Sequence, residues 1–124
     1  MKLNPDCIRD ILLAIEEDCS FRSTFQFPGN NNRLSSYSED EVLYHIKQCE
    51  LSDLVYKVTW FIGGSCCVKD LAPSGHQFLA DIRSENIWSK TKITAAKVGS
   101  SSLNTLVSIA SSIVAGLVKG QLGI

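Results

Sequence analysis

The sequence lacks the paired cysteine motifs that hold metal ions or build a disulfide framework. Its five cysteines are an odd number and include no Cys-x-x-Cys pair. Cys66 and Cys67 are adjacent, so on a strand their side chains point to opposite faces and are poorly placed to share a metal ion. His45 and His76 have no metal-ligand spacing to the cysteines. We therefore expect no metal, no cofactor and a reducing, cytoplasmic location, in keeping with the lack of a secretory signal at the N-terminus.

Neither sign of charge is in large excess. The 124 residues carry a net charge of −1, with 44% hydrophobic and 20% charged residues. This composition suits one domain with a modest core and excludes a disordered chain. The last third is more basic, because residues 85–124 contain Lys90, Lys92, Lys97 and Lys119 against Glu85 alone. Such a balance permits contact with nucleic acid or a membrane surface but requires neither.

Catalytic motifs are also absent. No serine lies in a Gly-x-Ser-x-Gly elbow, and Gly63-Gly64 lacks the lysine and the following helix of a phosphate loop. His45 and His76 could act in acid–base chemistry, with Asp53 or Asp81 as carboxylates, but their spacing pairs no nucleophile with a base. Histidines at such helical positions are more often hydrogen-bonded structural residues. We therefore expect no enzymatic activity.

Several start and stop signals predict helices and strands. Asn4-Pro5-Asp6 favours a helix start, because asparagine caps free amides, proline fits the first helical position and the acid suits the helix dipole. Ser38 and Glu41 form a capping box that opens a second helix. A β-branched and aromatic run stops at Gly63-Gly64, which indicates a hairpin. The expected elements are a helix over 5–18, a strand near 24–27 (or a poorly ordered helix), a helix over 39–50, strands over 54–62 and 65–71, and a helix from Pro73.

This order predicts an α+β fold with a winged-helix-like domain over residues 1–84. The domain comprises a helix, a short strand, a helix, a β-hairpin wing and a further helix. Residues 85–124 are expected to form a helical C-terminal extension. The usual second helix of a winged-helix domain is not evident in the sequence.

Four segments together resemble the family called domain of unknown function 2513, which comprises small proteins of bacteria and their prophages. The resemblance is strongest in Tyr44-His45-Ile46-Lys47 and in Gly75-His76, with Arg83 and Trp88 downstream. It implies no activity. We expect Tyr44, His45, Gly75, His76 and Trp88 to be structural residues around the corner where the hairpin meets its helix. The four segments are MKLNPDCIRDILLAIEE, EDEVLYHIKQCELSDLVY, LAPSGHQFLADIRSENIW and SKTKITAAKVGSSSLNTLVSIASSI.

The region from Ile46 to Leu54, with its later Leu-x-Pro-x-Gly, is also similar to winged-helix transcriptional regulators. Asp53 replaces a turn glycine of that pattern, which is tolerable because aspartate can adopt the left-handed conformation at modest cost. Ala72 replaces a capping threonine, which should weaken that helix start by about 1 kcal/mol.

The helix that would read DNA in such regulators is acidic here. Between Ser38 and Glu50 it has Lys47 against four acids. Phosphate binding depends on lysine and arginine, so this helix is badly suited to the major groove. DNA remains a possible partner through lysines elsewhere, and the candidate contacts are Lys57, Lys69, Lys90 and Lys92.

The segment between Lys97 and Lys119 has no charged residue. Leu103, Leu106, Ala110, Ile113 and Leu117 recur at spacings of a heptad seam, which predicts a helix that needs a partner. That partner could be the protein's own core or a second copy, a groove on another protein, or a bilayer. The serines make the segment weakly apolar, so a membrane is the least favoured of these.

These observations favour a protein that works by binding a macromolecule. A phage or mobile-element regulator that controls another protein, as an antitoxin or inhibitor would, is the first expectation. A winged-helix DNA-binding regulator that dimerises through the C-terminal helix is the first alternative. A membrane-active effector that uses the same helix is the second.

Overall fold

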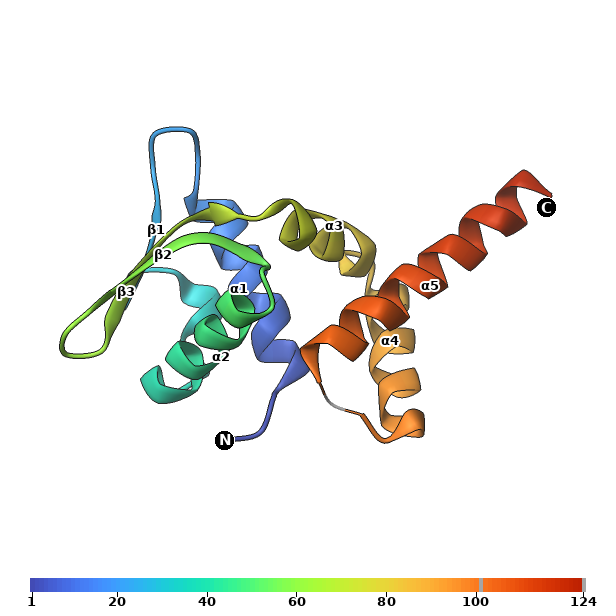
Figure 1. Ribbon diagram of the computed structural model, residues 1–124, viewed down its shortest axis with the longest axis horizontal. Helices are drawn as coiled ribbons and strands as arrows, with labels where there is room; N and C mark the ends of the chain where they lie inside the picture. Colours follow the sequence, from blue (N-terminus) through green and yellow to red (C-terminus); the bar gives the residue numbers. More distant parts are fainter. Residues whose placement is uncertain (101, 124) are drawn as a thin grey trace.

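The computed structural model describes residues 1–100 and 102–123. Within them the chain has an α+β fold of five α-helices and one three-stranded antiparallel sheet, as the sequence predicts (Figure 1). The order of elements is consistent with a winged-helix-like arrangement, and a single 3-10 turn stands where that fold has its second helix. The elements are α1 (Pro5–Asp18), β1 (Phe25–Phe27), η1 (Asn32–Leu34), α2 (Glu39–Leu51), β2 (Val55–Phe61), β3 (Ser65–Leu71), α3 (Pro73–Ile82), α4 (Glu85–Val98) and α5 (Leu103–Leu122).

The helix starts follow the capping residues that the sequence places there. The Asn4 carboxamide oxygen accepts a hydrogen bond from the Asp6 amide at 3.1 Å, and Pro5 occupies the first position of α1. The Ser38 hydroxyl accepts from the Glu41 amide at 3.1 Å at the start of α2. Each cap satisfies amides that have no partner within the helix. At α3, by contrast, Ala72 forms no side-chain cap, as expected from its side chain.

The core lies between one face of the sheet and helices α1, α2 and α3. α1 buries a full apolar stripe, and each such aliphatic side chain contributes roughly 1.5–3 kcal/mol. α2 buries Val42, Ile46 and Cys49, whereas Leu43 is only partly buried at the edge of the core. The fully buried positions of α1 are Cys7, Ile8, Ile11, Leu12, Ala14 and Ile15.

The sheet has the strand order β1-β3-β2, and its two faces differ. Val68 of β3 stands opposite Phe25 on β1 and Val58 on β2, and this row faces the core. Cys67 stands opposite Gln26 and Thr59, and this row faces solvent. Because neighbouring residues on a strand point to opposite faces, one side of the sheet is buried and the other is uncovered.

The last two helices pack against each other and α5 packs also against α3. Figure 1 shows that α5 begins beside the body of the protein and then runs outward beyond it to the C-terminus. Only its first half, at Leu103, Leu106 and Ala110, is buried. The second half therefore stands apart from the core.

Candidate interaction surfaces

The corner between the hairpin and α3 is built by close backbone packing. A Cβ atom added at Gly75 would lie 1.9 Å from the carbonyl oxygen of Leu54, so only glycine fits. The Ser74 hydroxyl donates to the Asp53 carbonyl oxygen at 2.6 Å, and the Ala72 amide donates to Leu54 at 3.0 Å. Asp53 itself has a φ of 58°, the left-handed conformation expected of a residue at this turn. The corner is thus a rigid junction.

His45 is a structural residue of the core. Its side chain is completely buried, and the Asn4 amide donates to Nε2 at 2.8 Å. A backbone amide can only donate, so Nε2 is an acceptor and Nδ1 carries the proton that it donates to the Glu41 carbonyl oxygen at 2.7 Å. Tyr44 packs edge-on against the ring. Nε2 thus joins the start of α1 to α2, and Nδ1 is bound within α2, which leaves neither nitrogen for proton transfer.

His76 lies on the surface rather than inside the corner. Its side chain is exposed, and Nε2 is 3.8 Å from Oδ1 of Asp70. The close contacts at the corner come instead from Gly75 and Ser74. Asp81, the other carboxylate considered for catalysis, accepts a hydrogen bond from Gln77 at 3.0 Å. The structure therefore brings neither carboxylate candidate together with His45.

Trp88 attaches α4 to the start of α1. Its indole Nε1 donates to Oδ1 of Asp6 at 2.9 Å, and the Lys92 ammonium binds the same oxygen at 3.0 Å. Burial acts to raise the pKa of Asp6, but the hydrogen bonds from Lys92 and Trp88 outweigh it and hold that pKa below its usual value. Two lysines of this helix were expected to contact nucleic acid. Lys92 is instead held in an ion pair with Asp6 of the same chain, whereas Lys90 is exposed.

The exposed side of α2 retains its acidic character in the structure. The lysine of this helix, Lys47, forms an ion pair with Glu50 at 2.8 Å and lies 5.3 Å from the centre of the Trp60 ring. The Trp60 indole also donates to Glu50 at 3.0 Å. Lys47 is therefore neutralised locally and does not present a free positive charge to a DNA groove.

The hairpin carries the two remaining candidate lysines. Lys57 and Lys69 are exposed, and the Lys57 ammonium lies 5.2 Å from the centre of the Tyr56 ring. Lys57 has a φ of 52°, which is unusual for a residue inside a strand. The sequence prediction missed that β2 is an exposed edge strand, because its apolar residues resemble those of a buried one. Phe61 at the end of β2 and Ile62 just after it are both exposed.

The predicted seam of α5 divides into two parts. Leu103, Leu106 and Ala110 are buried in the protein's own core, so these three are not a free partner surface. Ile113 is partly buried and Leu117 is 49% exposed. The partner-binding prediction is thus corrected to residues 111–122, which we call the free half of α5. Its exposed apolar side chains beyond Leu117 are Val118 at 50% and Leu122 at 67%.

A comparison with protein-family models identifies the chain. The family described as Hypothetical protein (DUF2513) matches residues 2–102. The chain belongs to this DUF2513 family. No curated protein and no solved structure matches the chain. The DUF2513 match covers every element from α1 to α4, and α5 begins at the residue after it.

The thiols of this DUF2513 chain are free, and most are shielded. Burial raises the pKa of Cys7 to about 12 and that of Cys66 to about 11. It also raises the pKa of the fully buried Cys49. Such thiols are poor nucleophiles at neutral pH. In the described part of the chain, no group of three or more His, Cys, Asp or Glu side chains is placed to hold a metal ion.

Proposed function

We propose that this DUF2513 protein is a non-enzymatic regulator that binds another protein through the free half of α5. The observation that carries the proposal is the exposure of Leu117, Val118 and Leu122 on a helix that extends beyond the core. An amphipathic helix of this kind binds by placing its apolar side in a groove of a partner. A Cβ atom added at Gly116 or Gly120 would meet no other part of the protein within 4 Å, so a partner can also approach the helix closely there.

The buried half of α5 supports this proposal because it fixes the direction of the free half. Leu106 and Ala110 are completely buried. A helix held rigidly at one end presents its other end at low entropic cost, which favours binding. Control of the bound protein, of the antitoxin or inhibitor type, is the form of regulation that we propose.

The two alternatives gain less from the geometry. A duplex-binding regulator would use α2, whose lysine is neutralised by Glu50. A membrane-active effector would use α5, which is long and apolar enough to cross a membrane by length and composition alone. However, spanning would require Leu103, Leu106 and Ala110 to leave the core, which would open cavities where they are packed.

The test compares three forms of the full chain as bait in nuclease-treated host lysate. Leu117→Glu with Val118→Glu places two charges on the apolar side of the free half. Ser112→Glu is the matched control, because Ser112 is exposed and lies about 140° around the helix from Leu117.

The proposal predicts that a stoichiometric protein partner binds the unchanged chain and the Ser112→Glu variant but not the double variant. Retention of the same partner by all three forms would contradict the assignment of the binding surface. If only further copies of the chain are recovered and light scattering shows a doubled mass, the free half of α5 serves self-association and the proposed regulation of another protein is wrong. Turnover of a substrate by the purified chain would overturn the non-enzymatic part.

A further inference from the structure

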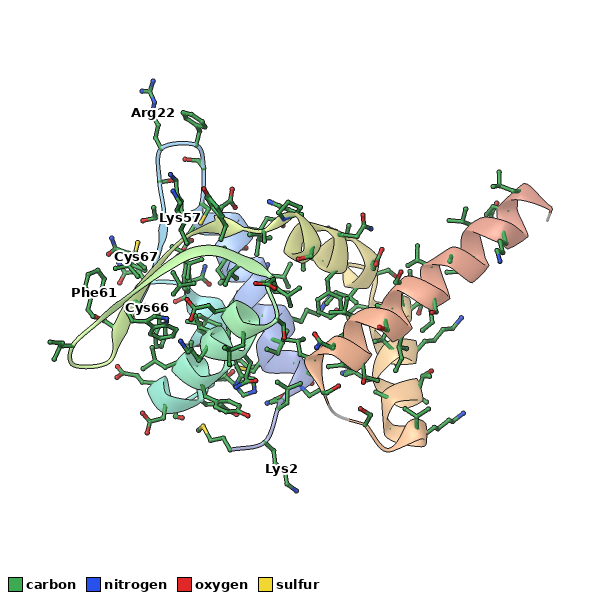
Figure 2. All side chains as sticks on the ribbon, viewed as in Figure 1. Lys2, Arg22, Lys57, Phe61, Cys66 and Cys67 are labelled. Carbon is green, nitrogen blue, oxygen red and sulfur yellow. The ribbon has the colours of Figure 1, made fainter. Side chains whose placement is uncertain are left out.

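The uncovered face of the sheet forms a second surface, separate from α5. It follows from the register, in which Gln26, Cys67 and Thr59 form one row across the three strands. Phe61 and Lys69 lie two residues from this row on the same face. Figure 2 shows the labelled Lys57, Phe61 and Cys67 on one side of the sheet and Cys66 on the other, toward α2. We call this surface the open face, and it comprises Gln26, Lys57, Thr59, Phe61, Cys67 and Lys69.

The open face carries free positive charge. Neither Lys57 nor Lys69 takes part in any of the ion pairs between described residues. Arg22, which is also exposed, lies at the tip of the adjoining loop, whose Thr24 accepts a hydrogen bond from the Cys67 thiol at 3.3 Å.

Two neighbouring acids, Asp18 and Asp70, act on the Cys19 thiol beside Val68, and Asp70 is next to Lys69 in the chain. Neither forms an ion pair with Lys57 or Lys69. Glu17, beyond β1, is bound by Arg33 at 2.9 Å. Glu50 of α2 accepts hydrogen bonds from the Lys47 ammonium and the Trp60 indole, and Trp60 stands opposite Cys66 in the sheet. Lys57 and Lys69 are therefore free to bind an anionic ligand, although Asp70 offsets part of their charge.

An exposed aromatic ring lies at one end of the open face. Phe61 is 53% exposed and borders a hollow of about 390 Å³. Besides Phe61, the hollow is lined by Gln26, Phe27, Pro28, Ser65, Cys66 and Cys67, so it combines apolar side chains with the polar Gln26 and Ser65. A planar ring that enters it can stack on Phe61 and form a hydrogen bond with Gln26.

We infer that the open face binds single-stranded nucleic acid, with a base stacked on Phe61 and phosphates bound by Lys57 and Lys69. Lys57 lies four residues from Phe61 along β2, roughly 13 Å at the rise of an extended strand. A single strand can therefore reach both ends of the face with a few nucleotides. Basic residues along the backbone and an aromatic platform for the bases are the two features that sequence-tolerant single-strand binding requires.

The geometry favours a single strand over two other anionic partners. In a duplex the bases are already stacked and paired, so Phe61 would gain no partner, and α2 has no free lysine for the groove. An acidic peptide would use the lysines but not the ring and the hollow beside it. Both partners serve as competing outcomes in the test.

The experiment measures binding of a fluorescent 15-nucleotide thymidine strand by anisotropy at 50 mM and 200 mM salt. Phe61→Ala is expected to weaken binding about tenfold, the effect of losing one stacked base. Lys57→Gln with Lys69→Gln is expected to weaken binding and to lower the slope of log K against log salt by about 1.4, or about 0.7 for each lost phosphate contact. Bound strand should also slow alkylation of Cys67, which lies at the centre of the face.

The control is Lys90→Gln, which removes an exposed lysine of α4 away from the sheet and should leave binding unchanged. Thermal unfolding by circular dichroism checks that every variant stays folded. Failure to bind the strand at 50 mM salt, equal binding by Phe61→Ala, or an equal loss in Lys90→Gln would overturn the inference. Tighter binding of a duplex of the same length, or of polyglutamate, would show that the open face binds that partner instead of a single strand. None of these outcomes involves the free half of α5, so this inference and the proposed function stand or fall separately.

Discussion

Gly75 is the residue with the least freedom to change. The start of α3 approaches the backbone of Leu54 so closely that a methyl group at this position would overlap the carbonyl oxygen. Gly75→Ala should lower the free energy of unfolding by about 3 kcal/mol or more, measured by urea titration, because backbone must move on one side of the corner. Gly116→Ala is the matched control. Nothing lies within 4 Å of that site, so alanine should raise stability by about 0.5–1 kcal/mol. Equal effects of the two substitutions would contradict the close approach.

Asp6 links stability to pH. Although its burial acts the other way, hydrogen bonds from Lys92 and Trp88 hold its pKa in the folded protein below its usual value. The ionised carboxylate therefore stabilises the fold above the unfolded-state pKa of about 4, and this stabilisation is lost as pH falls through the lower, folded-state pKa. The difference in free energy of unfolding between the unchanged chain and Asp6→Asn should accordingly be smaller at pH 3 than at pH 7. A difference of the same size at both pH values would show that the carboxylate has no such role.

Local signals in the sequence were sufficient for many single residues. The Asn4 and Ser38 caps and the left-handed Asp53 follow from the chemistry of each side chain and its immediate neighbours. The Trp88 contact with Asp6 could not be predicted in the same way, because the two residues are 82 positions apart. The partners of His45 likewise depend on how α1 docks on α2, which no local pattern specifies.

At the scale of elements, α5 serves both the core and the surface. A chain that ends at Gly99 loses Leu103, Leu106 and Ala110 from the core. Loss of two buried leucines costs about 2–5 kcal/mol each, which is comparable to the whole stability of a small domain. This truncated chain should be unfolded or should unfold at much lower urea concentration.

A chain that ends at Ser112 provides the comparison. It removes the free half of α5 apart from two residues and should lose about 1 kcal/mol or less, as surface changes do. Urea unfolding of both truncated chains beside the full chain measures the contrast. A chain ending at Gly99 with the stability of the full chain would contradict the packing of α5 on α3 and α4.

The sequence predicted the existence of most helices and strands but not how much of each is buried in the folded protein. The apolar seam of α5 is continuous from Leu103 to Leu117, so its periodicity cannot show that cover ends near Ala110. The run in β2 is rich in aromatic and β-branched residues, and such a run reads as a buried strand. Its position at the edge of the sheet, which depends on pairing with β3 alone, leaves Phe61 exposed. Exposure is a property of the assembled fold, which local sequence does not encode.

At the scale of the whole molecule, the protein has two separate surfaces on one body. The free half of α5 projects from one end, and the open face lies on the sheet. Both surfaces are exposed to solvent and consist of side chains that lie largely outside the core. We propose protein binding for the free half of α5 and binding of single-stranded nucleic acid for the open face.

The most direct test of the central claim is hydrogen–deuterium exchange of the purified chain, resolved along α5 and repeated at several protein concentrations. Amides of residues 106–110 should exchange slowly, because they are hydrogen-bonded within the helix on its buried half, whereas the first amides of α5 have no intrahelical acceptor. Those of residues 112–122 should exchange much faster at every concentration, since a short helical segment without tertiary contacts is only marginally stable. Equal protection of both halves at all concentrations would show that the protein already covers the free half. Protection that rises with concentration would show that a second copy does so.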